Sequence, residues 1–262
     1  MKKLTFKIIL LALCFSVAAA CGAEAKAPVK TEKVKRSTEI ADPLEPINRL
    51  IFGINDILDK ILIEPVAKTY KAIVPTPARN GVQNFIRNLE TPLIVANSLL
   101  QGKFGDAGVA TARFFINTTV GIGGLVDVAK SSGLTYKSED FGQTLATWGF
   151  GDGFYIVLPI LGPSSFRDGI GLAADTYADP VRIIADNTGK EWIYYTRAGL
   201  EGVDYRSRMI TAIDDLRRNS LDYYAAARSA YGQKRASLID DEGEGDGASA
   251  GSAPVIDYYA PQ

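Results

Sequence analysis

The sequence has no histidine among its 262 residues and only two cysteines. Without histidine there is no Ser-His or Cys-His nucleophilic pair, no HExxH zinc site and no histidine general base. Cys14 lies in a segment that we expect to be removed, so Cys21 is left without a partner for an internal disulfide. These absences exclude many hydrolase mechanisms and the disulfide-stapled class of secreted domains.

The remaining candidates for catalysis are two serines and three acids: Ser164, Ser165, Glu139, Asp140 and Asp168. No GxSxG elbow or Ser-x-x-Lys pair accompanies the serines, which fit helix caps. The adjacent carboxylates of Glu139 and Asp140 fit a solvated turn better than an acid and base pair. The sequence favours no reaction, and we predict that the protein is not an enzyme and has no cofactor and no metal site.

The first 20 residues have the pattern of a secretory signal peptide, with three lysines, an apolar run and then small residues. The sequence Ala-Ala-Ala-Cys that ends at Cys21 matches a bacterial lipobox, so we predict a lipid anchor on this cysteine. Ordinary cleavage at the A-x-A site is the alternative. Residues 21–41 are polar and rich in lysine, which predicts a tether between the membrane and the folded part.

Charge argues against a nucleic-acid partner. The sequence has 29 basic and 30 acidic residues; without the three lysines of the signal, 26 basic residues remain against 30 acidic ones, a net charge near −4. A protein with this balance has no strong positive field for nucleic acid.

The first folded segment, residues 47–62, predicts a strongly amphipathic helix. We expect Asp42, Pro43 and Glu45 to start this helix and Pro65 to end it. Periodicity alone favours a core helix, but a nearby lipid anchor at Cys21 raises the alternative of a helix lying at a membrane interface. The apolar stripe of this membrane-interface helix comprises Ile47, Leu50, Ile51, Ile54, Ile57, Leu58 and Ile61.

Two further helices follow. Thr91 and Pro92 are expected to open a short apolar helix that Gly102 closes. Residues 107–126 form an apolar stretch interrupted by Arg113 and Asn117, which are four residues apart and therefore on one helical face. A charge in the middle argues against a membrane-spanning helix. We expect a helix with one polar side, buried among its neighbours or lining a cavity.

Residues 139–168 combine aromatic residues, glycines and an apolar run. Glycines at 142, 149, 151 and 153 are expected to interrupt any helix, and Gly151 in particular to need unusual backbone freedom. Residues 154–158 predict an extended segment or hairpin arm, and the Ser165 to Asp168 spacing predicts a capping box that restarts a helix at Phe166.

In the C-terminal third, the apolar pattern predicts a helix that ends near Asp179, followed by a short helix and turn. An apolar helical stripe through residues 200–216 and a last helix to about Arg235 complete the prediction. We therefore predict one folded domain over residues 42–235. Residues 236–262 are acidic and rich in glycine, alanine and serine, which predicts a disordered tail.

Several of these segments together resemble the MlaA (VacJ) family of outer-membrane lipoproteins. The resemblance is carried, in order, by DPLEPINR at 42–49, ARNGVQNFIRNLETP at 78–92, NSLLQG at 97–102, GGLVDVA at 123–129 and the stretch 139–168. Ala146 departs from the glycine expected in this family. The positions that match the family motifs most clearly include Asp42, Pro43, Asn48, Arg49, Gly142, Trp148, Gly151, Gly153, Arg167 and Asp168.

The resemblance implies a mainly α fold in which interfacial amphipathic helices form a ring around an amphipathic channel, with short extended or hairpin segments. It also implies phospholipid as cargo, a trimeric porin of the outer membrane as a partner, and a periplasmic MlaC-like lipid-binding protein as acceptor. We expect the phospholipid passage to include Arg113, Asn117, Phe150 and Tyr155.

From the residues alone, an envelope hydrolase, a lipid transporter and a porin-associated scaffold all compete. The hydrolase lacks a visible nucleophile and base. The resemblance favours an outer-membrane lipoprotein that removes mislocalised phospholipid from the outer leaflet and passes it to the periplasmic carrier. A scaffold lipoprotein that binds a porin without transporting lipid is the alternative.

Overall fold

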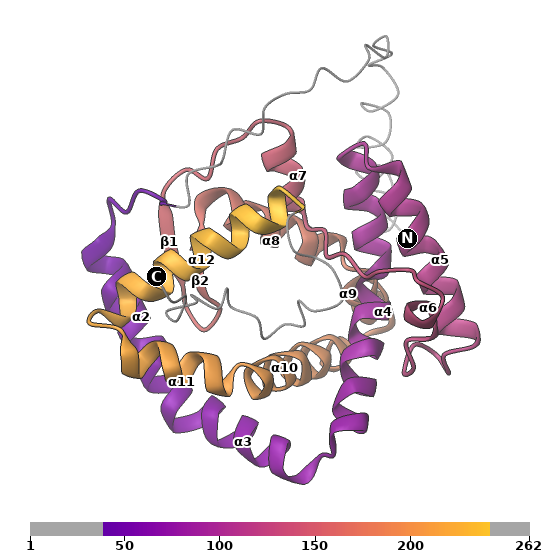
Figure 1. Cartoon of the computed structure of the whole chain (residues 1–262), viewed down its shortest axis with the longest axis horizontal. Coiled ribbons are helices and arrows are strands. Elements are labelled where there is room, and N and C mark those ends of the chain that lie inside the picture. Colours follow the sequence, from indigo (N-terminus) through magenta and orange to yellow (C-terminus); the bar gives the residue numbers. More distant parts are fainter. Residues whose placement is uncertain (1–38, 242–262) are drawn as a thin grey trace, which may run out of the picture. The chain divides into compact units, whose positions relative to one another are not determined.

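A computed structural model describes residues 39–241, all within one compact unit of the chain. This part is mostly helical, as expected, with one short hairpin (Figure 1). The predicted signal peptide, Cys21 and almost all of the tether lie outside the described residues. The elements are α2 (Glu45–Leu58), η1 (Asp59–Ile63), α3 (Glu64–Ile73), α4 (Thr76–Leu100), α5 (Phe104–Thr119), α6 (Val128–Ser131), α7 (Phe141–Thr147), β1 (Tyr155–Leu158), β2 (Gly162–Ser165), α8 (Phe166–Ala178), α9 (Pro180–Thr188), α10 (Glu191–Arg208), α11 (Ile210–Asn219) and α12 (Tyr223–Ile239).

The amphipathic helix is confirmed, but both of its predicted ends are wrong. Leu44, rather than Asp42, occupies the N-cap position, and no side chain caps the helix. Pro65 does not stop the chain: it falls in the first turn of α3, directly after the π-helical turn η1. The five-residue π-helix η1 joins α2 to α3 without a break in helical backbone.

The expected short helix at residues 93–100 is the last part of a 25-residue helix, α4, with Pro92 inside it. The prediction that Thr91 and Pro92 open a helix is therefore wrong. The Thr91 hydroxyl donates to the Arg87 carbonyl at 2.9 Å, within the turn that Pro92 disturbs. The end is confirmed: Gly102 has φ 75°, its N–H donates to the Leu99 carbonyl, and the N–H of Lys103 donates to the Ser98 carbonyl.

The stretch from Glu139 to Asp168 folds largely as predicted. β1 and β2 form an antiparallel hairpin in which Tyr155 pairs with Ser165, and the Ser165 hydroxyl caps α8 by accepting from the Asp168 N–H. Two expectations about glycine are wrong. Gly142 lies inside α7, where it allows close packing against α8, and a Cβ on Gly151 would meet nothing within 4 Å, at a φ outside the left-handed region.

The helices after the hairpin also follow the prediction, with two corrections. The stripe through residues 200–216 breaks at Met209 into α10 and α11. The last helix, α12, continues past Arg235 to the buried Ile239, so the folded part extends beyond the predicted boundary. Asp240 and Asp241 are described as well, while the rest of the predicted acidic tail lies outside the described residues.

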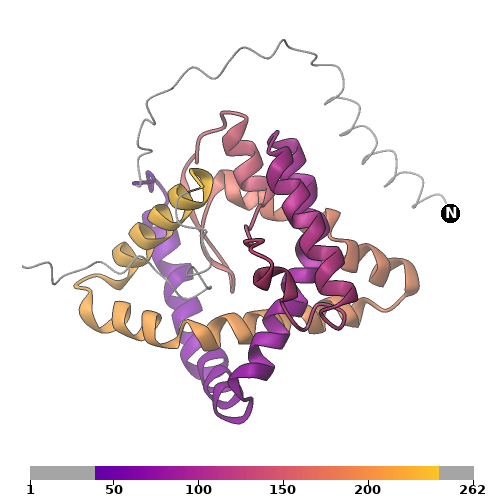
Figure 2. The ribbon, with the colours of Figure 1, turned by 45° about the vertical axis from the view of Figure 1, so that its right-hand side comes forward.

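Contacts between elements run around a closed circuit. From α2 they lead through η1 and α3 to α10 and α4, from α4 to α7, and from α7 through α8 and β2 back to α2. Figures 1 and 2 show the same ring-like order of helices from two directions. A buried aromatic group lies at the hairpin, where Tyr155 and Val157 of β1 pack with Tyr224 and Ile40. Among the described residues, no helix combines the length and apolarity needed to cross a membrane.

Candidate functional site

The stripe predicted for the first helix is mostly exposed. Leu50, Ile57 and Ile61 are 66%, 57% and 74% exposed, which is far above the exposure of core side chains. The stripe continues through Val66 to Ile73 in α3. Ile51 differs, since it packs against the buried aromatic group. We call the exposed part the apolar face of α2–α3; it comprises Ile47, Leu50, Ile54, Ile57, Leu58, Ile61, Leu62, Val66 and Ile73.

An ionic network attaches the polar side of this segment to the rest of the fold. Arg206 of α10 donates to both carboxylate oxygens of Asp59 at 2.7 and 2.8 Å. Arg217 of α11 reaches Asp56 at 2.8 Å and Glu64 at 3.3 Å. The segment is thereby held by its charged side, and the apolar face is left without a partner among the described residues. The sequence alone does not reveal this network, because its partners lie about 150 residues apart.

Arg113 and Asn117 are both buried, at 6% and 7% exposure. Both bind Asp127: the Arg113 guanidinium lies 2.7 Å from one carboxylate oxygen, and the Asn117 amide donates to the other at 2.9 Å. Burial alone would raise the pKa of Asp127, but these hydrogen bonds outweigh it and lower that pKa. Arg113 also donates to the Leu134 carbonyl. The predicted polar side of α5 therefore exists, and it anchors the segment that follows the helix.

Two small cavities adjoin this cluster. The larger, about 50 Å³, is lined by the apolar residues Ile94, Val109 and Ala110 and by the charged residues Asp106 and Lys137, among others. The smaller, about 10 Å³, lies among Asn84, Arg87, Asn88 and Asp127. Thr91, Arg113 and Tyr136 line both cavities. Arg113 therefore lies between a cavity with both apolar and charged lining and a smaller, mainly polar one.

The other two residues of the expected passage lie elsewhere. Tyr155 is fully buried in the aromatic group beside the hairpin, where its hydroxyl has no hydrogen-bond partner within the described part of the chain. Burial raises the pKa of this hydroxyl. Phe150 is 57% exposed, after α7. Neither residue lines either cavity, so the structure brings together only Arg113 and Asn117 of the four.

Residues of the N-terminal motif, 42–49, connect the start of α2 to β1 and α12. We call this group of contacts the first joint. Asn48, 2% exposed, exchanges hydrogen bonds with the backbone of β1: its amide donates to the Tyr155 carbonyl and its oxygen accepts from the Val157 N–H, both at 3.0 Å. Asp42 accepts from Asn48, Tyr224 and Arg228. Arg49 pairs with Asp222 at the start of α12. Pro43 is exposed and makes no such bond.

Residues of the motif at 139–168 form the second joint, in which they contact Arg235 of α12. Arg235 binds Asp140 at 2.7 Å and Asp168 at 2.8 Å, and Arg167 bridges Asp168 and Asp152. A Cβ on Gly142 would lie 2.6 Å from an Asp168 carboxylate oxygen, so this centre needs glycine there. The Trp148 indole N–H donates to the Leu100 carbonyl. Gly153, at φ 70°, faces Phe166 and allows the turn before β1.

Each candidate for catalysis takes part in a contact within the fold. Ser165 caps α8, and the buried Ser164 hydroxyl donates to a neighbouring carbonyl. Glu139 is 4% exposed, and Asp140 caps α7 and pairs with Arg235. The expectation of a solvated turn at Glu139 and Asp140 is therefore wrong: both carboxylates bind basic or amide groups far away in the sequence.

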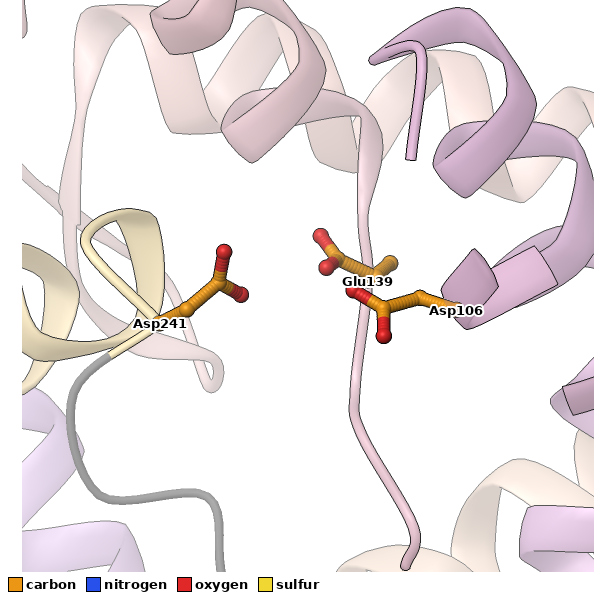
Figure 3. A group of neighbouring side chains, drawn as sticks. All are labelled: Asp106, Glu139 and Asp241. Atoms are coloured by element: carbon orange, nitrogen blue, oxygen red, sulfur yellow. The ribbon is translucent and has the colours of Figure 1, made fainter. Parts of the chain in front are cut away.

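The Glu139 carboxylate also belongs to a group of acids with Asp106 and Asp241, whose oxygens lie within 4.8 Å of one another (Figure 3). Lys103 lies 2.9 Å from both Glu139 and Asp241, and Lys137 lies 3.0 Å from Asp106. The two ammonium groups offset most of the negative charge. This group therefore joins α5, the segment before α7 and the end of α12 as an ion-paired contact.

Two neighbouring acids, Glu90 and Glu201, predict an unusual pH dependence of stability. Burial and the nearby Glu201 carboxylate raise the pKa of Glu90 to about 8, with Arg197 and Arg87 opposing that rise. Because the pKa is raised in the folded state, stability from protonated Glu90 is full below about pH 4.5 and is lost as the pH rises toward 8. We expect the free energy of unfolding to fall by up to about 1.4 kcal/mol per pH unit in this window.

The matched variant is Glu90→Gln, which keeps the shape of the side chain and cannot ionise. Urea denaturation of both proteins across this pH range measures the slope. The variant is expected to show a flatter profile and to exceed the wild type at pH 8 and above. Identical slopes in the two proteins would show that Glu90 ionises normally.

Comparison with known proteins agrees with these features. The family described as MlaA lipoprotein matches residues 40–238. The intermembrane phospholipid transport system lipoprotein MlaA of Escherichia coli (strain K12) is 37% identical over 200 residues, covering 74% of this chain and 76% of its own length. An uncharacterized protein of Rickettsia bellii (strain RML369-C) is 36% identical over 208 residues, covering 77% and 78%.

A solved structure described as the structural basis for maintenance of bacterial outer membrane lipid asymmetry has a TM-score of 0.67 and 36% identity, and it covers 76% of this chain and 99% of that one. The family match over residues 40–238 spans the helices that carry the apolar face and both joints. The predicted resemblance is confirmed, and the chain belongs to the MlaA lipoprotein family.

Proposed function

We propose that this protein is an outer-membrane lipoprotein, without enzymatic activity, that removes mislocalised phospholipid from the outer leaflet and passes it to a periplasmic lipid carrier. Membership of the MlaA family supports this proposal, as does the likeness to a structure described by outer membrane lipid asymmetry. The MlaA-named relative in Escherichia coli belongs to an intermembrane phospholipid transport system.

The observation that carries the proposal is the apolar face of α2–α3. Its side chains are exposed over three consecutive elements, while the opposite side is held by Arg206 and Arg217. A soluble protein rarely exposes so long an apolar surface without a partner. Helices with this pattern lie flat in the membrane interface with the apolar side among acyl chains, which supports a position of the fold at a phospholipid surface.

The proposed transport is passive. A phospholipid headgroup enters through a polar passage that includes Arg113 and Asn117, while its tails follow apolar helix surfaces, so that no charge crosses hydrocarbon unpaired. Because Arg113 is already paired with Asp127, its own charge carries little desolvation penalty in such a passage. Net movement then depends on a periplasmic MlaC-like carrier of higher affinity, since a channel alone only relaxes gradients.

We further propose that acyl chains on Cys21 hold the protein at the outer membrane and that a trimeric porin is its membrane partner. Each methylene buried from an acyl chain contributes about 0.8 kcal/mol, and two or more chains give stable anchoring. The porin would hold the helical unit in place within the leaflet.

The apolar face gives a direct prediction. In a Cys21→Ser background, Leu50→Ser and Ile61→Ser are each expected to weaken binding to neutral phosphatidylcholine vesicles by about tenfold or more, because burying such a side chain contributes about 1.5–3 kcal/mol. Thermal unfolding is expected to stay near the parent value, since both side chains are more than 60% exposed. Vesicle flotation measures the binding.

Lys60→Ser, in the same segment but on its charged side, is the control and is expected to leave vesicle binding almost unchanged. If Leu50→Ser and Ile61→Ser bound vesicles as tightly as the parent, the apolar face would not be the membrane contact.

The experiment that tests the proposed function is hand-over of lipid. The lipidated protein, reconstituted in vesicles with labelled phospholipid, is mixed with the soluble carrier, and the label bound to the carrier is measured over time. Transfer well above that of protein-free vesicles supports transport. Equal transfer with and without the protein would favour the scaffold, which binds a porin and moves no lipid.

A further inference from the structure

We propose that Arg87 binds the phosphate of a phospholipid at the mouth of the smaller cavity, between α4, α5 and the segment that follows α5. This inference rests on the proposed function and assigns a headgroup site to it. Four observations carry it: an arginine with no acidic partner, nearby acids that are already bound, a polar cavity of the right size for one oxygen, and an exposed apolar loop beside it.

Arg87 differs from the other half-buried or buried arginines of the fold. Within residues 39–241, its guanidinium makes no hydrogen bond or ion pair, and its one contact of note is the ring of Tyr136, whose centroid lies 4.4 Å from Cζ. Arg113, by comparison, pairs with Asp127, and Arg235 pairs with two aspartates. A planar guanidinium that stacks on a ring keeps its fork of N–H donors available for a phosphate.

The acids near Arg87 are engaged by other groups. Asp127 lines the same cavity, but both of its oxygens accept hydrogen bonds, one from Arg113 and the other from Asn117. Glu90, one turn along α4, interacts mainly with Glu201 and Arg197 and more weakly with Arg87, with which it forms no ion pair. The cavity therefore has two arginines and one carboxylate, and the charge left over is the positive charge of Arg87.

The cavity is polar and small. Asn84, Asn88 and Thr91 line it together with Arg87 and Tyr136. Its volume of about 10 Å³ holds roughly one water-sized group. One phosphate oxygen can therefore enter while the rest of the headgroup stays outside with Arg87, which suits a phosphate that remains attached to a larger molecule.

An exposed apolar loop lies beside the cavity. Asn84 donates to the Leu125 carbonyl at 3.3 Å, and a Cβ on Gly124 would collide with Asn88 at 2.7 Å, so the loop packs closely on α4. Its apolar side chains nevertheless face outward: Val120, Ile122, Leu125 and Val126 are 67%, 70%, 46% and 49% exposed. The acyl chains of a phospholipid can contact this apolar surface while Arg87 binds the phosphate. A free phosphate has no acyl chains and gains no binding energy from the surface.

The test is a binding titration on the intact lipoprotein in a nonionic detergent, followed by native mass spectrometry. The ligands are dioctanoyl phosphatidylethanolamine, dioctanoylglycerol, which lacks the phosphate, and inorganic phosphate. Arg87→Gln removes the charge, while Arg182→Gln is the matched control, because Arg182 also stacks on tyrosine rings but lies far along the chain in α9.

Arg87→Gln is expected to weaken binding of the phospholipid by roughly 10- to 100-fold, the effect of losing a charge-assisted hydrogen bond. Binding of dioctanoylglycerol by Arg87→Gln, and of all ligands by Arg182→Gln, is expected to match the wild type. Unchanged phospholipid binding by Arg87→Gln would overturn the proposal. Inorganic phosphate that binds the wild type as tightly as the phospholipid would also overturn it, in favour of a free-phosphate site.

This titration decides the headgroup site independently of the proposed function. Lipid transport can fail to appear in cells while Arg87 still binds phospholipid. Conversely, hand-over to the carrier can proceed normally in Arg87→Gln, in which case transport stands and the headgroup site lies elsewhere.

Discussion

Gly171→Ala is expected to lower the free energy of unfolding by about 2–3 kcal/mol, although it adds one methyl group in a helix. A Cβ at this position in α8 would lie 2.4 Å from the backbone nitrogen of Gly142 and 2.7 Å from its Cα. Because the atoms it meets are backbone, no side chain can rotate away. α7 and α8 must then separate, and the centre formed by Asp140, Asp168 and Arg235 opens with them. Urea denaturation measures the loss.

The control is a Gly→Ala substitution at a helix position where the added methyl group meets no other atom. A Cβ on Gly199, inside α10, meets nothing within 4 Å, so Gly199→Ala is expected to stabilise the protein by about 0.5–1 kcal/mol. Opposite signs for the two variants would show that close helix contact, and not helix propensity, decides the effect. A stabilising Gly171→Ala would contradict the close approach of α7 and α8.

Arg235→Gln is expected to cost about 1.5–3 kcal/mol, because Asp140 and the mostly buried Asp168 lose the guanidinium that joins them, while Asp168 still pairs with Arg167. Burial alone would raise the pKa of Asp140 and of Asp168, but the charge of Arg235 outweighs burial and lowers both. In the wild type, the stability that these acids contribute is present above their ordinary pKa and is lost as the pH falls.

Loss of Arg235 is expected to raise the pKa of both acids, so the deficit of the variant shrinks on acidification, when the carboxyls become neutral. Chemical denaturation at pH 7 and pH 4 tests this. Arg49→Gln, which breaks an exposed pair with Asp222, is expected to leave the unfolding midpoint nearly unchanged at both values. A deficit for Arg235→Gln that is small at pH 7 would mean that solvent reaches this centre freely.

The sequence correctly predicts those elements that are specified by residues close together in the chain. The stripe from Ile47 to Ile61, the glycine end of α4 and the hairpin with its Ser165 cap are all specified within a few neighbouring residues, and each appears as expected. Family resemblance added the ring-like order of helices and the class of function, which no single segment specifies.

Long-range contacts decided the positions where prediction failed. Asp42 has the identity of an N-cap, but Tyr224 and Arg228 in α12 bind its carboxylate instead. Pro92 has the identity of a helix start, yet tertiary packing along α4 keeps the helix continuous through it. Glu139 resembled a solvated acid because Lys103, its partner, is 36 residues away.

The residues of the candidate passage are likewise only partly predictable from local sequence. The spacing of Arg113 and Asn117 correctly placed both on one helical face, but only the fold brings Asp127 and Tyr136 to them. Arg87 could not be distinguished from other arginines in the sequence, because what marks it is the lack of an acidic partner in space. The motif around Tyr155 predicts a residue of the passage, whereas in the structure its side chain lies in the core.

The most direct test of the account is the amount of phospholipid exposed in the outer leaflet. It is measured with a membrane-impermeant, amine-reactive probe on cells that have the gene, lack it, or carry it again on a plasmid. We predict that exposure rises on deletion and returns to the wild-type level with the intact gene, but not with Leu50→Ser combined with Ile61→Ser. Unchanged exposure in the deleted cells would contradict removal of outer-leaflet phospholipid by this protein.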